Sequence, residues 1–239
     1  MRARENSALF SCKMKSGLLS LGVAIMTSHA LGQRTVSVPI PGLSTQIQAD
    51  LYGEGNRAVI LAHGGRFDRK SWAKQAQVLT EAGFAVLAIS FRGDTVNSDG
   101  SPSALGSDAD NATDVLAAAA YLRKAGAKTI SAVGGSLGGS AIGDADARSK
   151  PGAFECVVFL ASSGGDAPSR LTGRKLFIVA RDDQGPAGPR LAEISKHYAA
   201  APEPKKLVVV EGSAHAQFLF ETEQATRVMN EIVSFLSAP

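Results

Sequence analysis

The sequence predicts an α/β fold in which a mostly parallel, twisted sheet is covered by helices on both faces. Short runs of nearly continuous apolar residues recur along the chain, as in strands that are buried on both sides. Longer segments with helical spacing of apolar residues separate these runs. Strand and helix that alternate in this way form parallel sheets with right-handed crossovers. The 239 residues can bury a substantial core, and no linker rich in Pro, Ser or Gly divides them.

The N-terminal segment differs in kind from the rest of the chain. Four basic residues precede the short apolar run GLLSLGVAIM, and the small-residue stretch TSHALGQ follows it. This order is typical of an export signal peptide, and the run is too short for a helix that spans a bilayer. We expect cleavage after Ala30 or Gly32, with residues 1–32 as the signal peptide and a periplasmic or secreted product. A retained anchor is the alternative, and translation from Met14 in place of Met1 would give a shorter signal.

Removal of this segment changes the charge and the cysteine content. The full chain has a formal net charge of +3, but four of its 25 Lys and Arg and one of its 22 Asp and Glu lie in the signal peptide. The mature chain therefore has a net charge of zero, which gives no reason to expect a nucleic acid or an anionic membrane as a partner. Cys12 also leaves, so Cys156 has no partner for an internal disulfide. Within FECVVFL it reads as a small buried hydrophobic residue.

Eight strands are expected in the mature chain. The first two, TVSVPI and TQIQADLYG, read as an antiparallel pair, because their apolar positions alternate and Pro41 and Gly42 form a turn between them. Six buried strands follow in the order RAVILAH, FAVLAIS, KTISAVGG, FECVVFLAS, KLFIVA and KLVVVEG.

Amphipathic helices are expected between these strands. Gly83 and Gly126 end the first two helices, and Pro189 suits the first turn of the third. Each helix has an apolar face, formed by Trp72, Ala76 and Leu79 in the first, Ala112, Val115, Leu116, Ala119 and Leu122 in the second, Leu191, Ile194 and Tyr198 in the third, and Ala225, Val228, Met229, Ile232, Phe235 and Leu236 in the last.

Chemically reactive residues follow several of the buried strands. In such a sheet, ligands bind outside the carboxyl ends of the strands. HGGRF follows the first buried strand, Ser136 the third, RDDQG the fifth and SAHAQF the sixth. A serine, carboxylates and a histidine should therefore meet at one edge of the sheet. Gly134 and Gly138 flank Ser136 at two positions on either side, as a sharp turn from strand to helix requires.

These residue types suit nucleophilic catalysis. A neutral serine needs a base to take its proton as it attacks, and His215 is the candidate because it lies in a loop after the final strand. His29 lies in the signal peptide, His63 precedes the glycines of an early loop, and His197 falls in a helix pattern. A carboxylate must then orient the imidazole. Asp182 and Asp183 compete for this role, and side-chain alternation means that only one of them should face the histidine.

The motifs resemble those of the α/β-hydrolase superfamily. Residues 134–138 (GGSLG) match its nucleophile elbow G-x-S-x-G, with HGG upstream and Asp then His downstream. The resemblance extends from about Val36 to the C-terminus. Within the superfamily, LAHGGRFDRKSW and VLAISFRG are similar to small lidless esterases and dienelactone-hydrolase-like proteins, although the usual cysteine nucleophile of the latter is a serine here.

The resemblance carries several implications for the site. Its pattern places the triad acid three residues after Ala180, at Asp183. It implies an oxyanion hole made of the N–H groups of Leu137 and Gly65, with Arg66 as the alternative to Gly65. Only SGGDAPSRLTGR separates two strands where relatives carry a cap, so the site should be open. Ser90 departs from the pattern, since many relatives have an aspartate there, and the polar loop DTVNSDGSPSALG is expected to border the site.

Together these features predict a single catalytic domain over residues 33–239. The predicted activity is that of a serine hydrolase of the carboxylesterase type (EC 3.1.1), which cleaves esters through an acyl-enzyme intermediate. A transacylase or peptidase with the same triad, or a non-catalytic binding protein that keeps the fold, are the alternatives. No metal or cofactor is expected, because metal-ligand spacing and a phosphate-loop lysine are both missing from the sequence. The expected partner is a small-molecule or exposed acyl ester, without nucleic acid or stable membrane insertion.

Overall fold

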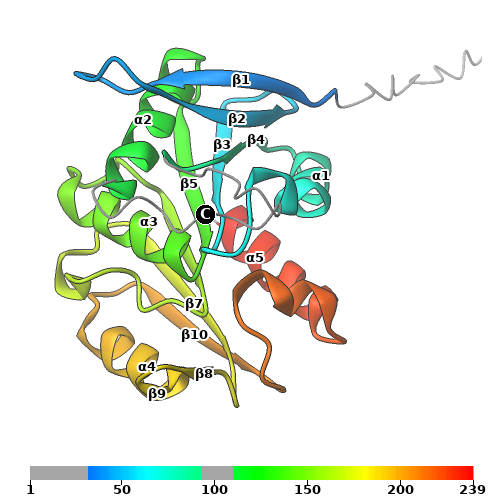
Figure 1. Ribbon diagram of the computed structural model, residues 1–239, viewed down its shortest axis with the longest axis vertical. Helices are drawn as coiled ribbons and strands as arrows, with labels where there is room; N and C mark the ends of the chain where they lie inside the picture. Colours follow the sequence, from blue (N-terminus) through cyan, green and yellow to red (C-terminus); the bar gives the residue numbers. More distant parts are fainter. Residues whose placement is uncertain (1–31, 93–109, 239) are drawn as a thin grey trace, which may run out of the picture. The chain divides into compact units, whose positions relative to one another are not determined.

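The protein contains one eight-stranded sheet, seen in a computed structural model that describes residues 32–92 and 110–238. The strand order is β1-β2-β4-β3-β5-β6-β7-β10 (Figure 1). The β1–β2 and β2–β4 pairs are antiparallel, and the other five pairs are parallel. In that order the strands are Arg34–Pro39, Gln46–Tyr52, Ala85–Ile89, Arg57–Ala62, Thr129–Gly135, Cys156–Leu160, Arg174–Ala180 and Lys205–Val210. All eight coincide with the strands expected from the sequence.

In the described ranges, five α-helices lie between or after the strands. They are α1 (Ala73–Glu81), α2 (Asn111–Lys124), α3 (Leu137–Arg148), α4 (Arg190–Ala200) and α5 (Ala225–Ser237). The sequence did not indicate the small hairpin of β8 (Gln184–Gly185) and β9 (Gly188–Pro189), or the 3-10 helices η1 (Arg69–Trp72), η2 (Pro168–Arg170) and η3 (Ala216–Glu221). Elements this short have too few residues to show a periodicity.

The sheet separates two apolar clusters, and both of its faces are covered by helices. Along β3, Ile60 packs into one cluster and its neighbours Val59 and Leu61 into the other, as alternation along a strand requires. Helices α2, α3 and α4 contribute to the Ile60 side, and α1 and α5 to the opposite side. The α/β fold with helices on both faces is therefore confirmed. Between β6 and β7, residues 161–173 contain only η2, so no cap is inserted there.

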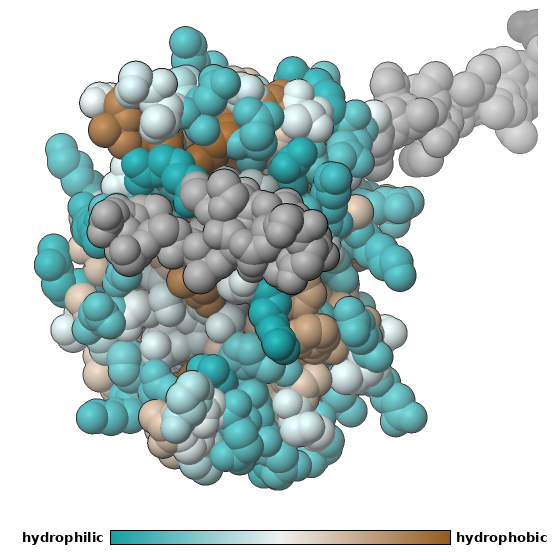
Figure 2. All heavy atoms as spheres, in the orientation of Figure 1, coloured by the Kyte–Doolittle hydropathy of each residue, from teal (hydrophilic) through white to brown (hydrophobic). Residues whose placement is uncertain are grey.

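The face of the molecule in Figure 2 is mainly hydrophilic, with apolar residues in separate small groups. Among the described residues, only Leu43 and Val78 are large apolar side chains with high exposure. No helix in the described ranges is both long and apolar enough to cross a membrane. The expected signal peptide and the polar loop after Phe91 fall largely or wholly on residues 1–31 and 93–109, outside the described part of the chain.

Lys175 is the one basic side chain, lysine or arginine, that is buried in the core among the described residues. The side chain of Lys175, in β7, is fully buried, and its ammonium group finds no hydrogen-bond partner among the described residues. Burial lowers the pKa of this ammonium below its usual value, and the negative charges of Asp146 and Glu203 offset only part of that shift. A charge without a hydrogen-bonded partner in an apolar environment costs folding free energy.

Replacing Lys175 by methionine, which has a similar shape, should therefore stabilise the protein. Burial of the protonated side chain costs folding free energy, so we expect K175M to raise the unfolding free energy at pH 7 by about 1 kcal/mol or more. Between the lowered folded pKa and the ordinary value near 10.5, the unfolded chain binds more protons, so wild-type stability rises with pH and the advantage of K175M shrinks. Urea unfolding at pH 7 and pH 10 measures this, with the exposed Lys128→Met as control. An advantage of K175M that stayed constant with pH would contradict the prediction.

Candidate active site

Ser136 lies on a very tight turn between β5 and α3. Its φ is +48°, a left-handed conformation that is strained for a residue with a side chain. A Cβ atom at Gly134 would lie 2.5 Å from the backbone of Gly138, and one at Gly138 would lie 2.2 Å from the carbonyl oxygen of Ala62. Only glycine fits at these two positions. The glycines that flank the serine in the sequence are thus required by the close approach of α3 to β3 and β5.

Asp183 and His215 are hydrogen-bonded to each other. The distance between Asp183 Oδ2 and His215 Nδ1 is 2.8 Å. Asp183 follows β7 and is 1% exposed, whereas its neighbour Asp182 is exposed. The other oxygen of Asp183, Oδ1, lies 3.7 Å from Nε of Arg190. A buried carboxylate on Nδ1 fixes both the orientation of the imidazole and the tautomer in which Nε2 is free to accept a proton.

The loop that carries His215 lies against the nucleophile turn. A Cβ atom at Gly135 would lie 3.3 Å from the Cβ of Ala216 and 2.9 Å from Oε1 of Gln217. Gly135 precedes Ser136, and Ala216 follows His215, so the two predicted reactive residues sit on touching segments. Among the described residues no hydrogen bond joins the Ser136 hydroxyl to His215. Such contacts are often long in enzymes without substrate.

Backbone strain is concentrated around this site. Ser136, Ala161 and Ala216 are the only non-glycine residues with φ in the left-handed region within the described ranges. Ser136 follows β5, Ala161 follows β6, and Ala216 follows His215. Strained conformations of this kind persist where the surrounding structure enforces them, and they gather at functional sites.

The predicted oxyanion residues lie on two segments, one after β5 and one after β3. Leu137 is the first residue of α3, and Gly65 lies in an exposed turn after β3. The turn is closed by the Phe67 N–H, which donates to Gly64 O at 3.0 Å. In the described part of the chain the N–H groups of Gly65 and Arg66 donate to no other residue. Backbone N–H groups that are oriented but unused can stabilise a developing oxyanion.

Gln217 is a residue of the site that sequence reasoning missed. Its side chain is 4% exposed and accepts a hydrogen bond from the Gly64 N–H at 2.7 Å. The only signal in the sequence is a polar residue two positions after the histidine, which by itself does not indicate a contact with a loop 153 positions earlier.

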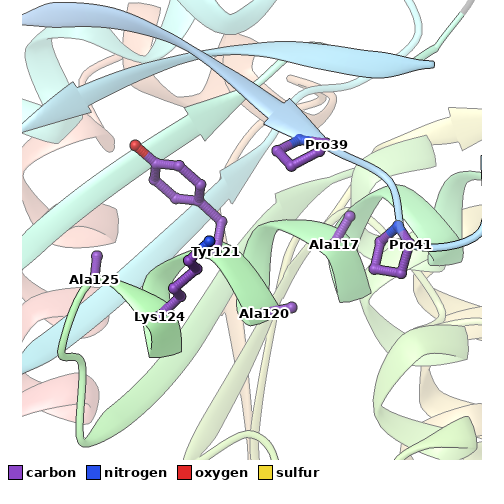
Figure 3. A pocket seen from close by; sticks show the side chains of 7 residues that line it. All are labelled: Pro39, Pro41, Ala117, Ala120, Tyr121, Lys124 and Ala125. Carbon is purple, nitrogen blue, oxygen red and sulfur yellow. The ribbon is translucent and has the colours of Figure 1, made fainter. Parts of the chain in front are cut away.

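A polar cavity of about 250 Å³ opens beside Ser136. Serine hydroxyls from α3 and from the segment after β6, and the charged groups of Arg190 and Glu193 on α4, line it. A second hollow, of about 470 Å³, lies between the end of β1 and α2 (Figure 3). Its walls are mostly apolar, with Pro39, Pro41 and Tyr121 among them, and it contains no nucleophile next to a base.

The remaining candidate groups do not form a site. Cys156 is buried, and burial raises the pKa of its thiol, which disfavours the reactive thiolate. His63 is buried next to Phe91, with Nδ1 2.9 Å from Gly64 O. No group of three or more His, Cys, Asp or Glu with the arrangement of a metal site occurs in the described ranges.

Comparisons with known proteins agree with this architecture. A family model described as "Alpha/beta hydrolase family" matches residues 59–193. A dienelactone hydrolase from Anabaena variabilis superimposes with a TM-score of 0.71 and 21% identity, over 86% of this chain and 97% of that one. An esterase from Pyrococcus furiosus superimposes with a TM-score of 0.63 and 16% identity, over 87% of this chain and 92% of that one. No match is found among curated proteins. At these identities the solved structures show a common fold, and the chemistry must be argued from the site.

Proposed function

Because this chain belongs to the alpha/beta hydrolase family, we propose that it is a serine hydrolase that cleaves carboxylic esters. The observation that carries the proposal is the buried Asp183 bonded to His215, in a loop that touches the strained turn of Ser136. This arrangement has the parts of a nucleophile, a base and an orienting acid.

The reaction begins with attack of the Ser136 oxygen on the ester carbonyl carbon. As the new C–O bond forms, the serine proton passes to Nε2 of His215, and Asp183 stabilises the resulting imidazolium. The N–H groups of Leu137 and Gly65 stabilise the negative charge on the former carbonyl oxygen. When the tetrahedral intermediate collapses, the leaving alcohol takes the proton from His215. Water then attacks the acyl-enzyme in the same way and releases the acid and free Ser136.

The polar cavity supports a short acyl group. Serine hydroxyls, Arg190 and Glu193 line about 250 Å³ beside Ser136, and a long alkyl chain there would displace water from polar groups without replacing its hydrogen bonds. Each polar group left unpaired costs about 1–3 kcal/mol. Long acyl chains should therefore be poor substrates.

A panel of p-nitrophenyl esters tests the proposal. We expect kcat/KM for acetate and propionate to exceed that for octanoate by about 5- to 150-fold, the factor that about 1–3 kcal/mol gives. A fluorophosphonate should abolish the activity and leave one adduct on the peptide that contains Ser136, as mass spectrometry would show. Folded protein with no ester hydrolysis and no adduct would contradict the proposed function. Equal rates for all chain lengths would contradict only the account of the cavity.

A further inference from the structure

Gln217 connects three segments that are distant in the sequence. Its Oε1 accepts the Gly64 N–H at 2.7 Å, and its Nε2 donates to Ser71 Oγ at 2.6 Å. The Ser71 hydroxyl donates in turn to the carbonyl of Asp68 at 2.6 Å. Both ends of the amide are therefore used, and only this orientation of the amide matches donors with acceptors.

The turn after β3 depends on such contacts. Gly64 and Gly65 are free in their backbone torsions, so hydrogen bonds must hold them. The Gly64 carbonyl is anchored by the Phe67 N–H, with His63 Nδ1 2.9 Å away. In a trans peptide the carbonyl and the following N–H point in opposite directions, so this anchor sets the direction of the Gly65 N–H. Gln217 anchors the other side of Gly64, because its side-chain oxygen accepts the hydrogen bond from the Gly64 N–H.

The same amide also lies against the nucleophile turn. A Cβ atom at Gly64 would be 3.3 Å from Oε1 of Gln217, and one at Gly135 would be 2.9 Å from it. The amide oxygen thus fills the space between the two segments that carry the predicted oxyanion donors, on Gly65 and Leu137. One buried side chain therefore contacts both segments.

We propose that Gln217 is a positioning residue that holds the Gly65 N–H in place for the oxyanion. The inference rests on the proposed hydrolase function and extends it to a residue outside the triad. Gln217 acts through Gly64, without touching substrate. Its loss should weaken transition-state stabilisation and leave ground-state binding nearly unchanged.

The variant Gln217→Met tests this role, because methionine keeps the length of the side chain and removes both hydrogen bonds. With p-nitrophenyl acetate we expect kcat to fall about 10- to 100-fold, which is no more than the fall in kcat that removal of an oxyanion donor itself causes. We expect KM to stay within about threefold of the wild-type value. The control is Thr172→Val. Thr172 lies just before the start of β7, whereas Asp183 follows the end of that strand, and the substitution removes the hydroxyl that donates to the buried Asp146. Melting temperatures of both variants measure their loss of stability.

A selective fall in kcat in Q217M, with T172V at the wild-type rate, supports the inference. A Q217M enzyme with wild-type kcat overturns it, as does a loss in both variants that follows their melting temperatures. Wild-type protein with neither esterase activity nor a Ser136 adduct would overturn the proposed function, and the inference with it. The two failures are therefore distinguished by the wild-type assay.

Discussion

Replacing Ser136 by alanine should lower kcat/KM for p-nitrophenyl acetate by about 10⁴- to 10⁶-fold, because it removes the atom that forms the acyl-enzyme. The fold should be retained. The Ser136 N–H donates to the Leu160 carbonyl at 2.9 Å through the backbone, and alanine keeps this bond. The residual rate would come from the backbone donors and from binding.

The control for this variant is Ser44→Ala, in the exposed turn between β1 and β2. It should keep the wild-type rate and the fluorophosphonate adduct, whereas S136A should lose both. Circular dichroism and melting temperature check that S136A is folded. Folded S136A that hydrolysed the ester at the wild-type rate would show that another group is the nucleophile.

Replacing Asp183 by asparagine should lower kcat about 10⁴-fold. The carboxylate accepts the Nδ1 proton of His215 at 2.8 Å, and it stabilises the charged imidazolium during the reaction. An amide that presents its NH₂ group would favour the other tautomer, with the proton on Nε2, where it cannot accept the serine proton. The volume of the side chain hardly changes, so the loss should lie in kcat.

Asp182→Asn is the matched control, because the two aspartates are adjacent and only Asp183 is buried. We expect D182N to remain within about threefold of wild type, as is usual for surface substitutions. The double variant S136A/D183N should be no slower than S136A, since residues that act as a unit are not additive. Loss of turnover in D182N together with an active D183N would show that the triad acid is Asp182 and not Asp183.

The sequence was sufficient for the order and type of the main elements. Runs such as KTISAVGG have the composition of strands buried on both faces, and the face with Trp72, Ala76 and Leu79 has helical spacing. These signals are local, so they can be read without knowing the neighbours of a strand. The preference for Asp183 over Asp182 came from the family pattern, since alternation along the chain indicates that only one of the two faces the histidine but not which one.

Other features depend on the assembled sheet. The order β1-β2-β4-β3 places β2 antiparallel to β4, although β3 lies between them in the chain. Lys175 opens an apolar run that reads as an ordinary strand, but packing leaves its ammonium buried. Arg190 reaches Asp183 only because the hairpin of β8 and β9 folds the chain back, and that hairpin is too short to leave a periodic pattern.

The sequence by itself determined the α/β class, the tight glycine-flanked turn at Ser136, and the appearance of an acid and a histidine after later strands. Each of these follows from steric or periodic requirements within a few residues. Tertiary structure alone decided that Gln217 meets Gly64 and Gly135. That contact joins loops at the ends of different strands, so it depends on strand order and on the path of each crossover, which local patterns do not specify.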